Sequence, residues 1–225
     1  KNPIHADLQL WIGAIERIYN SGINHIAAIH RGFHFYGKTK YRNKPMWQVP
    51  IELRTLFPDL PIICDPSHIS GNRELIAPVA QKALDLGVNG LMIESHVNPD
   101  VALSDAQQQL KPAQLNDLVS KLVIRKQSTD DVATTNKLSE LRKIIDEIDD
   151  ELLNILRKRT QIIEQIGNYK KDHNITIFQL ERWQEILRTR GQWADKIGLS
   201  RQHVEKICQL LHEESIRIQN GLMNS

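Results

Sequence analysis

The longest hydrophobic pattern of the chain lies between Leu138 and about Lys170. Apolar residues recur there at alternating steps of four and three, the period of an amphipathic helix: Leu141, Ile145, Ile148, Leu152, Ile155, Ile162, Ile166 and Tyr169. Such a helix would be roughly 50 Å long, more than the diameter of a compact hundred-residue domain. We therefore expect it to pair along much of its length with another helix, most simply the same helix of a second chain.

One position of this apolar series is charged, because the step after Ile155 falls on Arg159. A guanidinium on an apolar surface costs several kcal/mol unless an anion or a dense hydrogen-bond network meets it. Two further helices are predicted, from Ile177 to Arg190 and, after a turn at Gly198-Leu-Ser200, from Gln202 to Leu222.

The apolar side of the last predicted helix also carries polar residues, Ser215 and Gln219. Two interpretations stay open. Arg159, Ser215 and Gln219 could turn toward a shared polar pocket, or they could form a buried structural network that fixes the register of a helical bundle.

The first 126 residues show a different pattern, in which short apolar runs alternate with helical stretches. Strands are predicted at His25–His30, Leu60–Asp65 and Gly90–Glu94, and helices at Leu8–Asn20, Glu74–Leu86 and Pro112–Val123. This order indicates an α/β unit with a parallel sheet. Every strand ends in a polar cluster, and in a (β/α) barrel the C-terminal strand ends carry the chemistry.

Three residues near these strand ends could bind a metal ion. His68, Glu94 and Asp105 offer one imidazole and two carboxylates, a set suited to a divalent ion such as Mn, Fe, Co or Zn. The alternative is structural: His68 caps a helix, and the two carboxylates pair with neighbouring bases. Lys1 and Arg31 are likewise either phosphate clamps or solvated surface charges.

Composition narrows the class of protein. With 225 residues, 40% hydrophobic and 25% charged, the chain fits a soluble globular protein of one large or two modest domains. A formal charge of +2 does not suggest nucleic-acid binding. The two distant cysteines, with no secretion signal and no long apolar run, favour a reduced cytoplasmic compartment and no membrane association.

Proline divides the chain, since all nine prolines lie at or before Pro112. The polar run at 127–136 lacks apolar periodicity and is predicted to be a linker that ends at the N-terminus of the long helix. The expected organisation is an α/β domain at 1–126 and an all-α domain at 137–225.

The motifs of the first domain resemble a known family. Lys1-Asn-Pro3, His30-Arg-Gly32, Asp65-Pro-Ser-His68, Glu94-Ser-His96 and Ala102–Leu110 resemble, in order and spacing, the second half of a 3-deoxy-D-arabino-heptulosonate-7-phosphate (DAHP) synthase. The resemblance implies that His68, Glu94 and Asp105 bind the catalytic metal, and that Lys1 and Arg31 hold phosphoenolpyruvate. It also implies condensation of phosphoenolpyruvate with erythrose 4-phosphate, in which a metal polarises the aldehyde.

This half differs from a complete barrel, which has eight strands and usually more than about 200 residues. The family's metal-binding cysteine and its Lys-Pro-Arg motif belong to the first half, and Cys64 does not match that cysteine. Because the chain begins at Lys1, without an initiator Met, we expect it to be truncated upstream. A partial barrel exposes sheet edges, so the synthase activity is expected to be absent or to depend on the missing half.

The second domain resembles the all-α class of chorismate mutase, which forms an intertwined dimer. The resemblance rests on Leu141-Arg142, Ile145-Asp146, Asp149, Leu152-Leu153, Arg159, Ile166-Gly167, Lys170, Glu181-Arg182, Glu214-Ser215 and Gln219. It implies that Arg159 and the partner's copy of Arg142 bind the substrate carboxylates, and that Lys170 binds the ether oxygen and one carboxylate. By position, Arg182, Ser215 and Gln219 complete the pocket.

The rearrangement of chorismate to prephenate is a one-step pericyclic shift, so the mutase is expected to need no cofactor. Two positions depart from the family pattern. Gln179 and Trp183 stand where acidic residues occur, which leaves open what recognises the substrate hydroxyl; Glu181 or Gln184 could substitute, and Trp183 could pack in the core.

The combined expectation is a bifunctional enzyme of the shikimate pathway that dimerises through its helical domain. A regulatory hypothesis follows, in which chorismate or prephenate in the helical domain alters the synthase through the linker. The main alternative is a non-catalytic helical domain that dimerises or senses prephenate or chorismate. A nucleic-acid binder is disfavoured, because it would place its bases on an outward face.

Overall fold

The computed structural model describes residues 1–126 and 128–224 of the chain. The chain forms two compact units, Lys1–Thr129 and Asp130–Ser225, and each is described by itself. Gln127, which belongs to the predicted linker, and Ser225, the last residue of the predicted second domain, lie outside the described residues.

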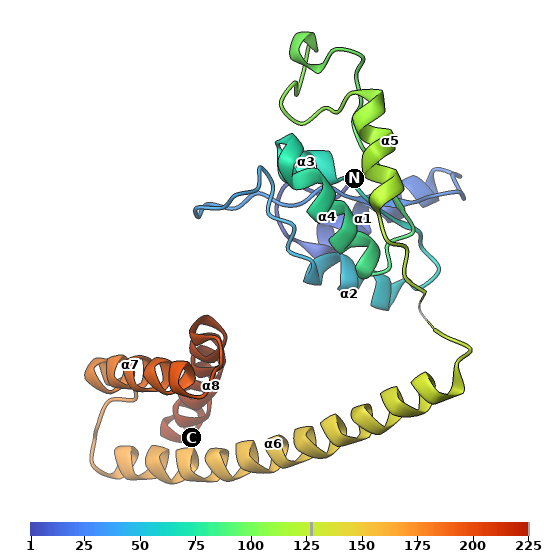
Figure 1. Ribbon diagram of the computed structural model, residues 1–225. Coiled ribbons are helices and arrows are strands. Elements are labelled where there is room, and N and C mark those ends of the chain that lie inside the picture. Colours follow the sequence, from blue (N-terminus) through green and yellow to red (C-terminus); the bar gives the residue numbers. More distant parts are fainter. Residues whose placement is uncertain (127, 225) are drawn as a thin grey trace. The chain divides into compact units, whose positions relative to one another are not determined.

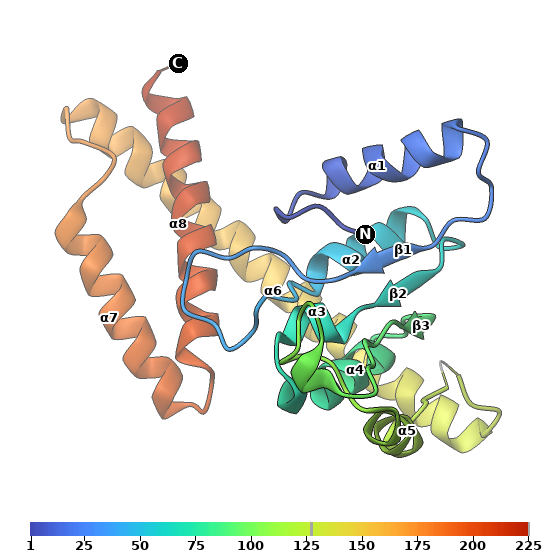
Figure 2. The ribbon, with the colours of Figure 1, turned by 90° about the horizontal axis from the view of Figure 1, so that it is seen from above.

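The first unit contains a small parallel sheet. Its strands are β1 (Ala28–His30), β2 (Ile62–Cys64) and β3 (Gly90–Leu91), in the order β1-β2-β3, and they lie side by side in Figure 2. All three predicted strands are therefore present, although each is shorter than its apolar run. The register aligns the strand ends, because His30 lies opposite Cys64, which lies opposite Leu91. Polar residues that follow these strands are thereby brought to one edge.

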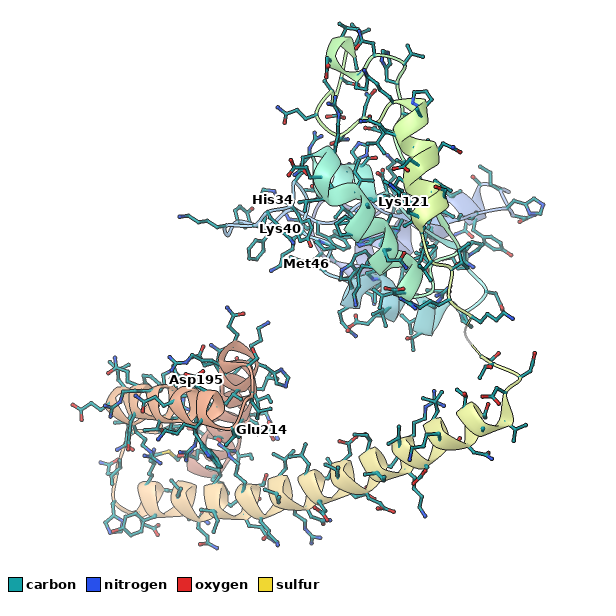
Figure 3. The ribbon with its side chains drawn as sticks, in the orientation of Figure 1. His34, Lys40, Met46, Lys121, Asp195 and Glu214 are labelled. Carbon is teal, nitrogen blue, oxygen red and sulfur yellow. The ribbon has the colours of Figure 1, made fainter. Side chains whose placement is uncertain are left out.

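Helices surround this sheet in the first unit. They are α1 (Leu8–Asn20), α2 (Gln48–Leu56), α3 (Pro66–Ser70), the 3₁₀ turn η1 (Arg73–Leu75), α4 (Ile76–Asp85), the 3₁₀ turn η2 (Pro99–Val101) and α5 (Pro112–Lys121). Part of the core consists of Trp11, Ile12, Ala28, Phe33, Leu53 and Ile62. A long loop joins β1 to α2 and carries His34 and Lys40 (Figure 3). The sequence pattern did not predict α2, whose Pro50 falls in the first turn, where a helix tolerates proline.

The second unit consists of α6 (Val132–Asp172), α7 (Leu180–Lys196) and α8 (Arg201–Met223). Figure 1 shows α6 as the long helix, and α8 packs against both α6 and α7. The linker prediction is wrong for residues 132–136, which are helical. The carboxylate of Asp131 accepts hydrogen bonds from the backbone amides of Ala133 and Thr134, and this cap starts the helix before its apolar periodicity begins.

The bounds of α7 also differ from the prediction of Ile177–Arg190. Gln179 has an extended backbone at the start of the helix, and the helix continues through Gly191 to Lys196. Gly191 does not end the helix; its position faces the side chains of Arg201 and Glu205, about 3.3 Å from where a Cβ would stand. The start of α8 agrees with the prediction, since Ser200 caps it by accepting from the amide of His203.

The N-terminal part of α6 carries an apolar stripe that is largely exposed. Leu141, Ile145, Ile148 and Leu152 are each about half accessible to solvent, whereas Gly167, further along α6, is buried against α8. Among the described residues, no helix is long and apolar enough to cross a membrane.

Candidate functional sites

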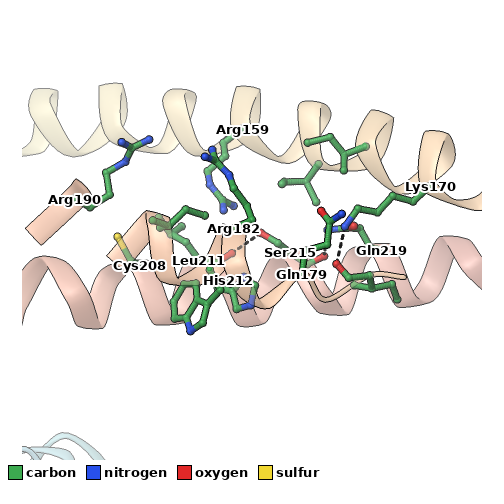
Figure 4. Close-up of a pocket in the computed structure, with 15 residues that line it drawn as sticks. Arg159, Lys170, Gln179, Arg182, Arg190, Cys208, Leu211, His212, Ser215 and Gln219 are labelled. Carbon is green, nitrogen blue, oxygen red and sulfur yellow. Dashed lines mark hydrogen bonds between the residues drawn. The ribbon is translucent and has the colours of Figure 1, made fainter. Parts of the chain in front are cut away.

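The three helices of the second unit enclose a cavity of about 490 Å³ (Figure 4). This volume lies in the usual range for a small-molecule site. Side chains from all three helices and from the α6–α7 loop line it: Arg159, Ile163, Ile166, Lys170, Ile177, Gln179, Arg182, Trp183, Ile186, Arg190, Cys208, Leu211, His212, Ser215 and Gln219. Five residues that the resemblance to chorismate mutase assigned to one pocket therefore meet here: Arg159, Lys170, Arg182, Ser215 and Gln219.

The charged side chains of this cavity are all cationic. Helix α6 contributes Arg159 and Lys170, and α7 contributes Arg182 and Arg190, whereas none of the described residues that line the cavity is acidic. In Figure 4 the side chains of Arg159 and Arg182 extend into the same space between the helices. Arg182 also pairs with Glu185, one turn along α7, at 2.5 Å. Convergent cations in a partly apolar cavity form a site suited to an anion.

Lys170 reaches the cavity from the end of α6. Its ammonium donates a 2.6 Å hydrogen bond to the backbone carbonyl of Ile177, in the segment that joins α6 to α7. Burial lowers the pKa of Lys170 from its ordinary value of 10.5, because desolvation disfavours the charged form.

Two polar residues of α8 face the same space. Ser215 is 4% exposed and Gln219 is 6% exposed. Such complete burial is uncommon for polar side chains. The Ser215 hydroxyl donates to the carbonyl of Leu211 at 2.5 Å, and the Gln219 amide nitrogen donates to the carbonyl of Ser215 at 3.2 Å. The amide oxygen of Gln219 is buried and has no hydrogen-bond partner among the residues that the structure describes, which gives the pocket an unused polar atom.

Arg142 is the one predicted mutase residue outside this group. It is exposed on the N-terminal part of α6 and is not among the residues that line the cavity. Its assignment to the site of a partner subunit stays a prediction.

The structure also brings residues to the cavity that the sequence argument did not assign. Trp183 stacks on His212 with ring centroids 4.2 Å apart and planes 12° apart, and both line the cavity with Arg190 and Cys208. Burial, and then the charges of Arg159 and Lys170, lower the pKa of His212. Helical spacing contained the signal, because His212 lies three residues before Ser215 on one face of α8.

A second cluster forms in the first unit beside the strand ends. The Nε2 atom of His68 lies 3.7 Å from a carboxylate oxygen of Glu94 and 3.8 Å from one of Asp105. One potential ligand atom from each residue lies within 4.8 Å of the other two. An imidazole and two carboxylates at this separation fit a divalent ion. The residues present therefore fit the metal that the sequence pattern predicted.

Neighbouring groups hold this triad in place. Asp65 caps α3 by accepting from the His68 amide, and its other carboxylate oxygen lies 2.8 Å from the His68 Nδ1, although this contact does not have hydrogen-bond geometry. Arg42 pairs with Asp105 at 2.5 Å, and its guanidinium is the main cause that lowers the pKa of Asp105. The Asp105 backbone has φ 51°, a left-handed conformation that clusters at functional sites.

Lys1 and Arg31 lie near the same cluster. The Lys1 ammonium is 3.4 Å from Asp65, and the charge of Arg31 contributes to the lowered pKa of Asp105. Asn2 anchors this segment, because its side chain accepts from the Arg31 amide at 2.6 Å and donates to the Gly32 carbonyl at 2.8 Å. Part of the structural alternative also holds, since Asp105 does pair with a neighbouring base.

Comparisons with known proteins divide the chain in the same way. Residues 1–133 match the family model described as "DAHP synthetase I family", and residues 141–220 match the one described as "Chorismate mutase type II".

Individual relatives match one part of the chain each. "Phospho-2-dehydro-3-deoxyheptonate aldolase" of Thermotoga maritima is 35% identical over 48% of this chain and 31% of its own length. "T-protein" of Haemophilus influenzae is 32% identical over 37% of this chain and 22% of its own length. A crystal structure of the Thermotoga maritima aldolase has 29% identity, covers 53% of this chain and 35% of that chain, and superposes with a TM-score of 0.48. These three matches span between 22% and 35% of the relative's own length.

Proposed function

Because this chain belongs to the DAHP synthetase I family and also carries a type II chorismate mutase domain, we propose that it acts at two steps of the shikimate pathway. The helical unit, Asp130–Ser225, rearranges chorismate to prephenate. The α/β domain, residues 1–126, is the second half of a (β/α)₈ barrel that, completed, condenses phosphoenolpyruvate with erythrose 4-phosphate.

The cavity of the helical unit carries the mutase proposal. It combines four cations, no lining carboxylate among the described residues, and the two buried polar side chains of Ser215 and Gln219, next to several apolar residues. Chorismate is a small dianion, and its rearrangement requires no nucleophile. The protein has only to hold the reactive conformer and to stabilise negative charge on the breaking ether oxygen.

Each residue has a distinct part in this proposal. Arg159 binds a carboxylate, Lys170 binds the ether oxygen and a carboxylate, and Gln219 donates a hydrogen bond to the ether oxygen. Arg182 and Ser215 complete the enclosure of the substrate. All of these groups act by position and charge, so the reaction proceeds without a proton relay.

A homodimer follows from the same proposal. The exposed stripe of Leu141, Ile145, Ile148 and Leu152 would be covered by the matching helix of a second subunit, as apolar residues at this period favour. Arg142 directly follows Leu141 and lies about one helical turn before Ile145. It would then supply its guanidinium to the partner's cavity. Two equivalent sites would result.

Turnover separates this proposal from the sensor alternative. The purified chain is expected to accelerate the loss of chorismate, measured together with chorismate binding by titration calorimetry. Binding without any acceleration would support the non-catalytic dimerisation or sensing module, and it would contradict the mutase assignment.

For the synthase, His68, Glu94 and Asp105 would hold a divalent ion, which when bound would supply the positive charge that polarises the aldehyde. Lys1 and Arg31 would bind the phosphate and carboxylate of phosphoenolpyruvate and so orient its reacting carbon. The test removes metal with a chelator from the full-length protein and adds Mn, Fe, Co or Zn back. Loss and recovery of synthase activity are expected; activity that persists without metal would contradict the proposal.

A further inference from the structure

We propose that Gln108 and Arg42 are positioning residues that orient the two carboxylates of the His68–Glu94–Asp105 triad. Neither residue belongs to the metal ligands proposed above. The inference rests on that proposed metal site, and it adds that metal affinity depends on a hydrogen-bonded chain behind the ligands.

Gln108 is the centre of this chain of contacts. It is 1% exposed, and its side-chain nitrogen donates to Glu94 Oε2 at 2.8 Å, while its side-chain oxygen accepts from Arg42 Nη1 at 2.9 Å. The orientation of the amide is fixed by its neighbours, because an ionised carboxylate can only accept and a guanidinium can only donate. The side-chain amide of Gln108 therefore cannot flip by 180° without losing both hydrogen bonds.

Arg42 completes the connection to the second carboxylate. The same Nη1 atom donates to Asp105 Oδ1 at 2.5 Å, so an unbroken series of contacts runs from Glu94 through Gln108 and Arg42 to Asp105. Each carboxylate is held by one oxygen and presents the other to the imidazole. Glu94 Oε1 lies 3.7 Å and Asp105 Oδ2 lies 3.8 Å from His68 Nε2.

A glycine beside Arg42 leaves room for the arginine side chain. Gly71, which ends α3 with φ 71°, would carry a Cβ only 2.5 Å from the Cβ of Arg42. The adjacent Asn43 donates from its side chain to the carbonyl of His68 at 2.7 Å. The segment that carries Arg42 is thus tied to the helix that carries the imidazole.

Groups that orient metal ligands typically change metal affinity by about 10- to 100-fold when they are removed. Gln108→Met keeps the approximate volume of the side chain but removes both hydrogen bonds, which frees Glu94 and Arg42 together. Arg42→Met removes the contact with Asp105 and leaves Gln108 with a single partner. Because both residues act through one chain of contacts, their effects should be less than additive.

The experiment measures the dissociation constant of Mn²⁺ for the full-length protein by competition with a chromogenic chelator. Gln108→Met and Arg42→Met are each expected to weaken Mn²⁺ binding by about 10- to 100-fold. The matched control is Gln109→Met, since the Gln109 side chain donates to the Ser104 carbonyl and, among the described residues, bonds to neither carboxylate of the triad. Its Mn²⁺ affinity should stay close to that of the unmodified protein.

A purely structural role is distinguished by two further measurements. The electron paramagnetic resonance spectrum of bound Mn²⁺ should change in both variants, because the ligand geometry changes, while the melting temperature of the metal-free Arg42→Met variant should change little. Unchanged Mn²⁺ affinity and spectrum in Arg42→Met would overturn the inference and leave the metal site standing. Failure of the unmodified protein to bind Mn²⁺ would overturn both.

Discussion

Gly167 of α6 and Gln219 of α8 lie so close together that a Cβ on Gly167 would stand 3.2 Å from the Cγ of Gln219. The same Cβ would stand 2.9 Å from a terminal methyl of Leu222. The missing side chain at position 167 lets the two helices approach, and this approach sets where the Gln219 amide lies in the cavity.

Gly167→Ala should therefore be less stable than Gly221→Ala, its matched control on α8. Both substitutions gain about 1 kcal/mol of helix propensity, but Gly221 has open space around it whereas Gly167 does not. Overpacking costs about 1–3 kcal/mol. We expect Gly167→Ala to fall at the lower end of this range, because the terminal methyl of Leu222 can move away from the new Cβ. Urea unfolding of the two variants measures the difference; equal free energies of unfolding would mean that the helices separate without cost.

Arg159→Ala should lower kcat/KM for chorismate by about 10²–10³-fold, the usual loss when one preorganised donor to a developing negative charge is removed. Arg157→Ala is the control, because Arg157 is exposed on the same helix and does not line the cavity. Steady-state kinetics on both variants tests the assignment. An equal, small effect of the two substitutions would place the chemistry elsewhere.

Ile148→Lys should convert a dimer into a monomer, because it places a charge in the middle of the stripe that we propose lies between two subunits. Asp150→Lys introduces the same side chain two residues away, on the opposite face of the helix, and should leave the dimer intact. Light scattering coupled to size-exclusion chromatography distinguishes one chain of 25.9 kDa from twice that mass. A monomeric unmodified chain would contradict the dimer itself.

His30 should make the first unit sensitive to acid. It is buried between Trp11, Phe33 and Trp47. Burial lowers the pKa of His30 from 6.5 to about 4, and the nearby carbonyl of Pro45 offsets this only in part. The unfolded chain therefore binds the proton more readily, so stability present above pH 6.5 is lost as the pH falls toward 4, by up to about 3 kcal/mol.

His30→Phe should remove this part of the pH dependence, because phenylalanine does not titrate. Urea unfolding at a series of pH values between 7 and 4 gives the slope, and His25→Phe, at an exposed position, should keep the slope of the unmodified protein. The same slope in all three proteins would assign the acid sensitivity to other groups.

Periodicity placed Arg159, Ser215 and Gln219 on the apolar sides of their helices, because a regular helix fixes which residues share a face; Lys170 and Arg182 were assigned only by the resemblance to chorismate mutase. Arg159 and Lys170 are eleven residues apart, close to three helical turns, so their convergence follows from the sequence. The start of α6 was missed because residues 132–136 lack apolar periodicity and the cap at Asp131 supplies the helix signal there. Arg42 and Gln108 lie on loops 66 residues apart, and no local pattern brings such residues together.

The contact between Lys170 and the Ile177 carbonyl means that the ammonium is already engaged before any anion arrives. The ammonium has two further N–H groups for an anion, so a bound dianion would share Lys170 with this carbonyl. Occupancy of the cavity and the conformation of the α6–α7 connection would then be thermodynamically coupled, and each would bias the other equally. A substitution in the α6–α7 connection that leaves every side chain of the cavity intact should therefore change the affinity for the ligand.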